Sequence, residues 1–199
     1  MTKTRRVLYP LALLVVILLV WQGAVTALGV PPYLMPTPIG LAQYFMNYLQ
    51  SGTLLANMAT TLQEVIIGTY WGILLGIVLG YLIAKVHIIE KLLTPLILIL
   101  QIAPKISLAP LFVLWFGLGI GSKVALVMLV VSFPVMITEN SALHGIDQNY
   151  QDLMSVLGAN KWQRFSKLEC PLVFASVMTG VKVSLTQAMT GAVIGEMIG

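Results

Sequence analysis

Long apolar segments, separated by short polar segments that carry most of the basic residues, dominate this chain of 199 residues. The first apolar segment runs from Val7 to about Leu28. A helix needs roughly 20 apolar residues to cross the hydrocarbon core of a bilayer, so this segment is long enough to span a membrane. Only 9% of the residues are charged, against about 25% in soluble domains. The sequence therefore predicts an integral membrane protein.

Four more apolar segments follow, at about 62–84, 92–116 and 124–137 and from Pro171 to the end of the sequence. Between the first two spans, residues 31–61 contain a proline cluster and no Lys or Arg. This pattern favours a loop that leads into a surface-lying helix at Ile39–Leu49. The polar stretches are too short to form a separate soluble domain. We expect one domain over residues 1–199, an all-α, polytopic transmembrane helical bundle with five visible spans.

Basic residues indicate which side of the membrane each polar segment occupies. The positive-inside rule assigns three clusters to the cytoplasm: Lys3, Arg5 and Arg6; Lys85, His87 and Lys91; and Lys161, Arg164 and Lys167. The N-terminus is therefore expected inside and Lys123 outside. A cleaved signal peptide is the alternative for the first segment, because Val25 and Ala27 suit a cleavage site.

Small residues recur at every fourth position of two predicted spans, as Gly68, Gly72, Gly76 and Gly80, and as Ser176, Gly180, Ser184 and Ala188. Residues at this spacing share one helix face, so a neighbouring backbone can approach closely there. The pattern favours tight helix packing over direct contact with a substrate. The single cysteine, Cys170, and the lack of Cys clusters argue against a disulfide framework and a bound metal.

Two polar groups within predicted spans are candidates for a transport pathway. The third span is interrupted near its middle by Gln101, Pro104, Lys105, Ser107 and Pro110, which predicts a broken helix with an ammonium at membrane depth. Lys105 could instead extend to the membrane surface or pair with a carboxylate, such as that of Glu64 or Glu196.

The fifth span carries the other group, Ser184, Gln187 and Thr190, with Lys182 and Glu196 nearer the ends of the helix. Hydrogen bonding between helices is the alternative explanation for these residues.

A polar, basic loop at about 139–171 joins the fourth and fifth spans. Asp147 can cap a short helix that ends near Leu157, Gly158 suits a left-handed turn, and Asn160 with Gln163 resembles a capping box. We expect two short helices at an angle, with Pro171 at the start of the next membrane helix. Such a rigid pair suits docking into another protein. The alternative is an amphipathic connector on the bilayer, which Trp162 and Phe165 would favour.

These residues resemble the cytoplasmic signature of the permease subunits of bacterial ABC importers, which reads Glu-Ala-Ala, three residues, Gly, nine residues, Ile, one residue, Leu-Pro. Asp152, Leu153 and Met154 stand at its start, and Gly158 and Pro171 follow at the required spacing. Asp replaces Glu, Leu and Met replace both alanines, Leu168 stands for Ile and Cys170 for Leu.

The surrounding sequence is similar to the sulfonate, taurine and nitrate branch of that family. The similarity lies in the segment 109–117 with Gly119, in Phe133-Pro134, and in Pro36-Thr37-Pro38. It extends from about Pro36 to Gly199 and implies a sixth helix beyond Gly199, so that the chain looks truncated.

The resemblance implies a permease in the bacterial inner membrane that translocates a small solute. Its partners would be an ATPase dimer, a second permease copy, identical or different, and an external solute-binding protein. The permease would not be an enzyme and would bind no cofactor, because ATP and Mg²⁺ act in the separate ATPase. No Walker A loop occurs in this chain. Asp152, Gly158 and Pro171 would shape the coupling loop, and we add Trp162 and Arg164 as expected ATPase contacts.

Two other classes of protein remain as alternatives. An ion-coupled secondary transporter or channel would also place polar groups in membrane helices. An intramembrane enzyme is disfavoured, because no HExxH or GxSxG motif occurs within an apolar span. The sequence does not decide the identity of the substrate. Lys105 suggests an anion such as a sulfonate, whereas related branches carry pyrimidine vitamin precursors and flavins. Nothing in the sequence suggests nucleic-acid binding.

Overall fold

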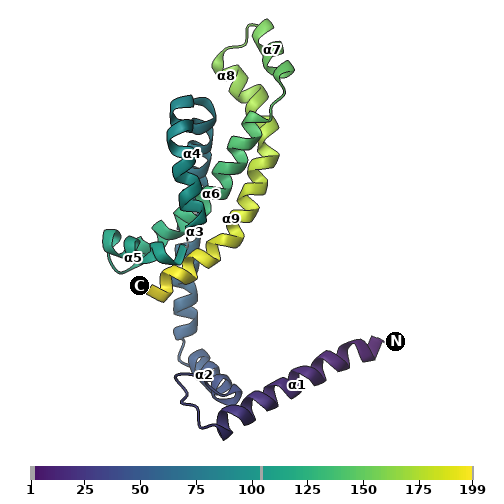
Figure 1. The fold of residues 1–199 in the computed structure, drawn as a ribbon, viewed down its shortest axis with the longest axis vertical. Coiled ribbons are helices and arrows are strands. Elements are labelled where there is room, and N and C mark those ends of the chain that lie inside the picture. The colour runs from purple at the N-terminus through teal and green to yellow at the C-terminus, as the bar shows by residue number, and fades with distance from the viewer. Residues whose placement is uncertain (1–2, 104, 199) are drawn as a thin grey trace. The chain divides into compact units, whose positions relative to one another are not determined.

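A computed structural model describes residues 3–103 and 105–198, with side chains from residue 8 onward except those of residues 105 and 106. Within these residues the chain forms helices and no strands (Figure 1). It divides into two compact units, residues 1–59 and 60–199, and the division falls within one long helix. The helices are α1 Lys3–Ala27, α2 Pro38–Gln50, α3 Thr53–Lys85, α4 His87–Ile102, α5 Lys105–Phe116, α6 Ile120–His144, α7 Gln148–Val156, α8 Lys161–Arg164, η1 Phe165–Glu169 and α9 Cys170–Ile198.

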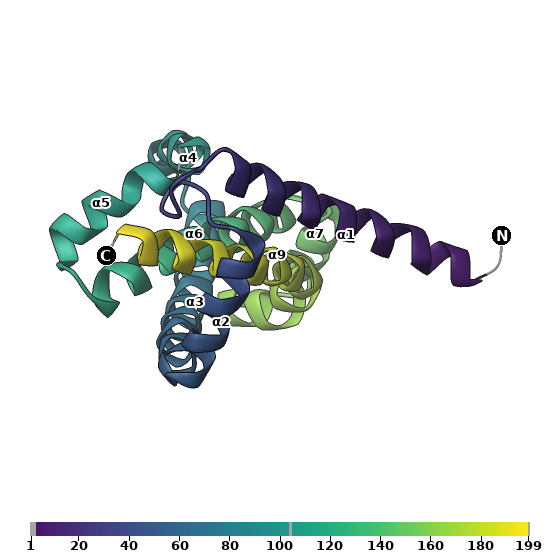
Figure 2. The same ribbon diagram turned by 90° about the horizontal axis from the view of Figure 1, so that it is seen from below.

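Among the described residues, four helices are long and apolar enough to cross a membrane, at Leu8–Ala27, Thr53–Lys85, Ile120–His144 and Lys161–Ile198. A fifth crossing is made if α4 and the following helix, α5, count as one span. The two helices are bent relative to each other by 112°, and Figure 2 shows α5 running out to one side of α6 and α9. The predicted all-α, multi-span membrane fold is confirmed, and the third span is broken as expected.

In the first unit, α2 begins where the sequence places a helix-start signal. The Thr37 side chain accepts a hydrogen bond from the Gly40 N–H at 3.1 Å, and Pro38 occupies the first turn. Proline suits this position because the first N–H groups of a helix have no partner within it. The Ile39 N–H donates to Gln22 Oε1 at 3.3 Å, which ties the start of α2 to α1.

In the second unit, α6 is the central helix and, among the described residues, contributes more buried apolar side chains than any other helix. Val127, Val131 and Val135 are fully buried along one of its faces. The glycine stripe of α3, which is Gly68, Gly72, Gly76 and Gly80, lies against this face of α6. A Cβ atom at Gly72 would lie 2.8 Å from the Met128 carbonyl oxygen, so the two backbones approach more closely than any side chain would allow.

The small residues of α9 pack on α6, and Figure 1 shows these two helices side by side. Ser184 is fully buried, and its hydroxyl donates to the Val131 carbonyl at 2.8 Å. Ala188 is fully buried in the same cluster. A Cβ at Gly180 would overlap the hydroxyl oxygen of Thr138. Small side chains on both α3 and α9 therefore let α6 sit between two closely packed neighbours.

Two details of the predicted loop are wrong. Its first residues, 139–144, belong to α6, which continues to His144 and buries Glu139. Pro171 does not start a separate helix, because α8, η1 and α9 form one continuous helix from Lys161 to Ile198. The join is a π-helical turn in which the Cys170 N–H donates to the Phe165 carbonyl. Proline has no N–H, so a widened turn just before Pro171 accommodates the missing hydrogen bond without breaking the helix.

Candidate functional site

The loop between α6 and α9 extends beyond one end of the second unit, where α7 and α8 are seen in Figure 1. The Asp147 carboxylate caps α7 by accepting from the Asn149 N–H at 2.9 Å. Gly158, which follows α7, has φ = +66°, a conformation that side-chain-bearing residues rarely adopt. Asn160 and Gln163 form the reciprocal capping box that opens α8. Local sequence signals therefore set the bend between the two short helices.

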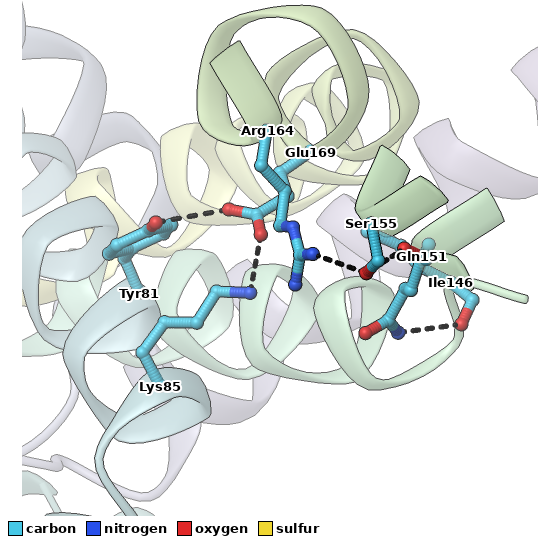
Figure 3. Close-up of polar contacts among 7 residues, drawn as sticks. All are labelled: Tyr81, Lys85, Ile146, Gln151, Ser155, Arg164 and Glu169. Carbon is cyan, nitrogen blue, oxygen red and sulfur yellow. Dashed lines mark hydrogen bonds and ion pairs between the residues drawn. The ribbon is translucent and has the colours of Figure 1, made fainter. Parts of the chain in front are cut away.

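A buried carboxylate fixes this loop to α3 (Figure 3). Glu169, in η1, has a side chain only 6% exposed and accepts from Lys85 Nζ at 2.6 Å. Its other oxygen accepts from the Tyr81 hydroxyl at 3.0 Å. Both donors lie in the last turns of α3. Charge-assisted hydrogen bonds are stronger than neutral ones, so the base of the loop is firmly attached to α3. We call this the loop end of the bundle.

Two further hydrogen bonds hold the loop in shape (Figure 3). The Arg164 guanidinium donates to the Ser155 hydroxyl at 2.9 Å, which joins α8 to α7. The Gln151 side-chain amide donates to the Ile146 carbonyl at 3.3 Å, which joins α7 to the segment before it. The loop is thus a braced pair of helices.

Apolar side chains on α7 and α8 are exposed, although the loop as a whole is polar. Tyr150 and Leu153 are more than half exposed, and Val156 and Leu157 are still more so. Trp162 is 71% exposed and contacts the Phe165 ring. Tyr150 and Leu153 lie one turn apart and therefore share a face of α7. Exposed apolar residues on a rigid element are typical of a protein-binding surface.

The predicted coupling residues occupy different environments in this loop. Asp152 is exposed and accepts from the Gln148 side-chain amide at 2.9 Å. Trp162 and Pro171 are exposed, whereas Arg164 is half-buried and makes its hydrogen bond within the loop. Sequence reasoning missed Tyr81, Lys85 and Glu169. The signal available in the sequence was Glu169, an acidic residue that stands just before an apolar span in a segment otherwise rich in basic residues.

A pocket of about 760 Å³ lies beneath the loop, between α3, α6 and α9. Its lining is mostly apolar and includes Tyr81, Trp162 and Phe174. Glu139 also lines it, is 6% exposed, and has one carboxylate oxygen without a hydrogen-bond partner. A Cβ at Gly80 would lie 2.8 Å from that oxygen, so Gly80 provides the space that Glu139 occupies.

The predicted pathway residues differ in their exposure. Gln101 and Thr190 are exposed, and Gln187 is half-buried and already engaged in an interaction. Ser184 lies in the α6–α9 contact, which fits hydrogen bonding between helices. Lys105 is the first residue of α5, but its side chain lies outside the described residues.

A second polar group, also missed from sequence, joins α3, α6 and α9 at the other end of the unit, which we call the far end. Glu64 is fully buried, and its carboxylate lies 3.8 Å from Lys123 Nζ. Neither Glu64 oxygen has a hydrogen bond. The Thr61 hydroxyl donates to Glu196 of α9. Within the described residues, no group of His, Cys, Asp and Glu side chains is arranged to hold a metal ion.

The family model of the binding-protein-dependent transport system inner membrane component matches residues 72–199, which contain the glycine stripe from Gly72 onward, the loop and α9. The chain belongs to this family. It is a multi-pass membrane permease of the ABC importer type, and its relatives are transport components.

Relatives of this ABC permease cover nearly its full length. It is 32% identical to the formylaminopyrimidine transport permease protein ThiX of Halalkalibacterium halodurans, over 100% of this chain and 79% of ThiX. It is 34% identical to the riboflavin transport system permease protein RibX of Chloroflexus aurantiacus, over 93% of this chain and 69% of RibX. The taurine transport system permease protein TauC of Escherichia coli is 24% identical, over 98% of this chain and 73% of TauC. These matches support the branch that the sequence motifs indicated.

Proposed function

We propose that this permease works in a complex with an ABC ATPase dimer, a second permease copy and an external solute-binding protein. The loop between α6 and α9 docks on the ATPase, on the cytoplasmic side of a bacterial inner membrane, and the N-terminus lies on the same side. ATP and Mg²⁺ act in the ATPase and not in this chain. The observation that carries the proposal is the braced α7–α8 pair with its exposed apolar side chains.

The exposed side chains of this pair are suited to a groove on another protein. Tyr150 and Leu153 on α7, with Trp162 on α8, supply aromatic and apolar contacts, which dominate binding energy at protein interfaces. Asp152 adds an exposed charge beside them. Gly158 and the Arg164–Ser155 hydrogen bond fix the shape of the pair, so little conformational freedom is lost on docking.

Movement of the docked loop would be transmitted to the membrane helices through two connections. The first is covalent, because the helix that begins at Lys161 continues without a break to Ile198. The second is the contact of Glu169 with Tyr81 and Lys85, which couples the loop to α3. ATP-driven closure of the ATPase pair would thus tilt α9 and α3 together and switch access to the pathway from one side of the membrane to the other.

The cargo is a small solute delivered by the binding protein, either an anion of the sulfonate or taurine type or a vitamin precursor of the pyrimidine or flavin type. The names of ThiX, RibX and TauC support this range. Gln101, Lys105, Gln187 and Thr190 are proposed to line the pathway. We leave Ser184 out, because it is fully buried in the contact with α6 and its hydroxyl donates to the Val131 carbonyl.

Co-purification and transport measurements test this proposal. The chain would be expressed with its neighbouring ATPase and binding protein and reconstituted in vesicles. We expect the ATPase to co-purify with the permease, and we expect solute uptake to require ATP. Leu153→Asp should weaken ATPase binding strongly, whereas Leu185→Asn, at an exposed position in the middle of α9, should leave it unchanged. Uptake driven by an ion gradient without the ATPase would support a secondary transporter and overturn the proposal.

A further inference from the structure

The exposed face of α9 carries a line of polar residues, of which the predicted pathway included only Thr190. Thr179, Lys182, Thr186 and Thr190 follow one another at spacings of three and four residues and are all exposed. These spacings place them on one face of the helix. The opposite face, with Val177, Ser184 and Ala188, packs within the bundle. We call the first set the α9 polar stripe.

Lys182 lies near the middle of α9, so the expectation that it stands nearer an end of the helix is wrong. It comes twelve residues after Cys170 and sixteen before Ile198, the two ends of α9, which correspond to about 18 Å and 24 Å of helix. A lysine side chain cannot cover either distance, because each exceeds three helical turns. If the span is centred in the bilayer, we therefore expect the ammonium to stay inside the hydrocarbon region rather than reach the membrane surface.

Lys182 has no ion-pair partner among the described side chains. All seven acidic residues of the chain are described, all lie within residues 60–199, and none pairs with Lys182. The neighbouring threonines carry no charge to pair with it, and the hydroxyls of Thr179 and Thr186 donate to carbonyls of their own helix, those of Ala175 and Lys182. A charge at this depth must face water or protein, because lipid cannot solvate it.

We propose that Lys182 faces the water-filled translocation pathway and selects a substrate that carries an anionic group, such as a sulfonate or carboxylate. This inference rests on the proposed function, because it needs a pathway beside α9. An ammonium has three donors and no acceptor, and its attraction for an anion is strengthened in a narrow passage with walls of low dielectric constant. A single lysine binds less tightly than a bidentate arginine, which suits a site that must also release its ligand.

Cysteine labelling tests the proposal and does not require the substrate to be identified. Cys170, the sole cysteine, would be replaced by serine, and Thr186→Cys introduced one turn beyond Lys182. The full permease–ATPase complex in membranes would be treated with two reagents of similar size, the anionic 2-sulfonatoethyl methanethiosulfonate and the cationic 2-(trimethylammonium)ethyl methanethiosulfonate. Both react only where water reaches the thiol. Thr190→Cys gives a second position on the stripe.

We expect both cysteines to react, with the anionic reagent favoured. Lys182→Gln should lower the ratio of the anionic to the cationic rate about tenfold, because the nearby positive charge is lost. The matched control is Lys91→Gln, which removes the same charge from an exposed position on α4 and should leave the ratio unchanged. Cysteines that fail to react, or a ratio that Lys182→Gln does not alter, would overturn the proposal.

Uptake measurements separate this inference from the proposed function. Vesicles containing the complex and its binding protein would be offered taurine and riboflavin. The inference is supported if the complex takes up taurine with ATP, if Lys182→Gln lowers this uptake at least tenfold, and if Lys182→Arg retains it. ATP-dependent uptake of riboflavin that is unaffected by Lys182→Gln would leave the proposed function intact and reject Lys182 as the selecting residue.

Discussion

At the loop end of the bundle, Glu169 accepts hydrogen bonds from both Lys85 and Tyr81, whereas at the far end Glu64 faces Lys123 across 3.8 Å with no hydrogen bond to either oxygen. Both carboxylates are buried, and both contacts involve α3. Of these two carboxylates, only Glu169 makes the short, directed hydrogen bonds that hold two elements in one geometry. We therefore expect the loop to move rigidly with α3, whereas the Glu64–Lys123 contact contributes less to the far end, where the Thr61–Glu196 hydrogen bond also joins α3 to α9.

The largest expected effect comes from Gly72→Leu, which would disturb both ends at once. A Cβ at this position would lie 2.8 Å from the Met128 carbonyl and from Val131, so α3 would have to move away from α6. We expect a loss of stability of about 3 kcal/mol or more, because overpacking a close backbone contact displaces whole helices. The measurement is the free energy of unfolding of the purified protein in an SDS titration.

Gly23→Leu in α1 is the matched control for this substitution, because nothing lies within 4 Å of a Cβ placed at Gly23. It should change the free energy of unfolding by less than about 0.5 kcal/mol. Equal effects of the two substitutions would show that the glycine stripe does not hold α3 against α6.

Glu169→Ala should have the next largest effect, because it leaves Lys85 and Tyr81 without their acceptor. We expect a loss of stability of about 2–3 kcal/mol. This is below the value for a fully buried pair, since the Lys85 side chain is 38% exposed. Transport per ATP hydrolysed should also fall, because the loop is no longer attached to α3. Glu169→Gln, which can still accept from Tyr81, should be affected less, and equal losses would argue against the hydrogen-bond explanation.

Gly158→Val tests the shape of the loop rather than its attachment. Its φ of +66° is unfavourable for a β-branched residue, at a cost of about 1–3 kcal/mol. If the docked loop must adopt this conformation, the cost reduces the affinity for the ATPase by about 5- to 150-fold. Titration of the permease with the purified ATPase would measure this affinity. Gly158→Asn should bind nearly normally, because asparagine tolerates this conformation. Wild-type binding by Gly158→Val would contradict the docking assignment.

The smallest effect is expected at the far end. A double-mutant cycle with Lys123→Met and Glu64→Gln should give a coupling free energy of about 1 kcal/mol, because the two groups attract without a hydrogen bond. The same cycle with Lys85→Met and Glu169→Gln should give a larger value. Both cycles use unfolding in SDS as the readout. A coupling at the far end as large as that at the loop end would remove the difference between the two ends.

Local patterns in the sequence predicted much of the fold. The apolar segments located the spans, and the signals at Asp147, Gly158 and Asn160 described α7 and α8. These predictions succeeded because helix formation and capping depend on residues a few positions apart. The period of four in the glycines of α3 also indicated a packed face, since residues at that spacing necessarily share a side of the helix.

Contacts between distant residues could not be obtained in this way. Lys85 and Glu169 are 84 residues apart, and the sequence around either residue does not indicate that the other is its partner. The Glu64–Lys123 pair was missed for the same reason, although the sequence analysis named Glu64 as a possible ion-pair partner of Lys105. On α9, sequence spacing alone did not show which polar residues point inward, so Ser184 was grouped with the exposed Thr190. Which of these residues points inward depends on how α9 is rotated about its own axis against α6.

The wide turn at Phe165–Glu169 sets how α8, and the loop beyond it, is rotated relative to α9. A π-helical turn contains about one residue more than an α-helical turn, and one residue corresponds to about 100° around the helix axis. Deleting a residue there would turn α8 by that amount relative to α9, because Ser184 and Ala188 hold α9 against α6. The direction in which the α7–α8 pair faces its docking partner is thus decided at the base of the loop.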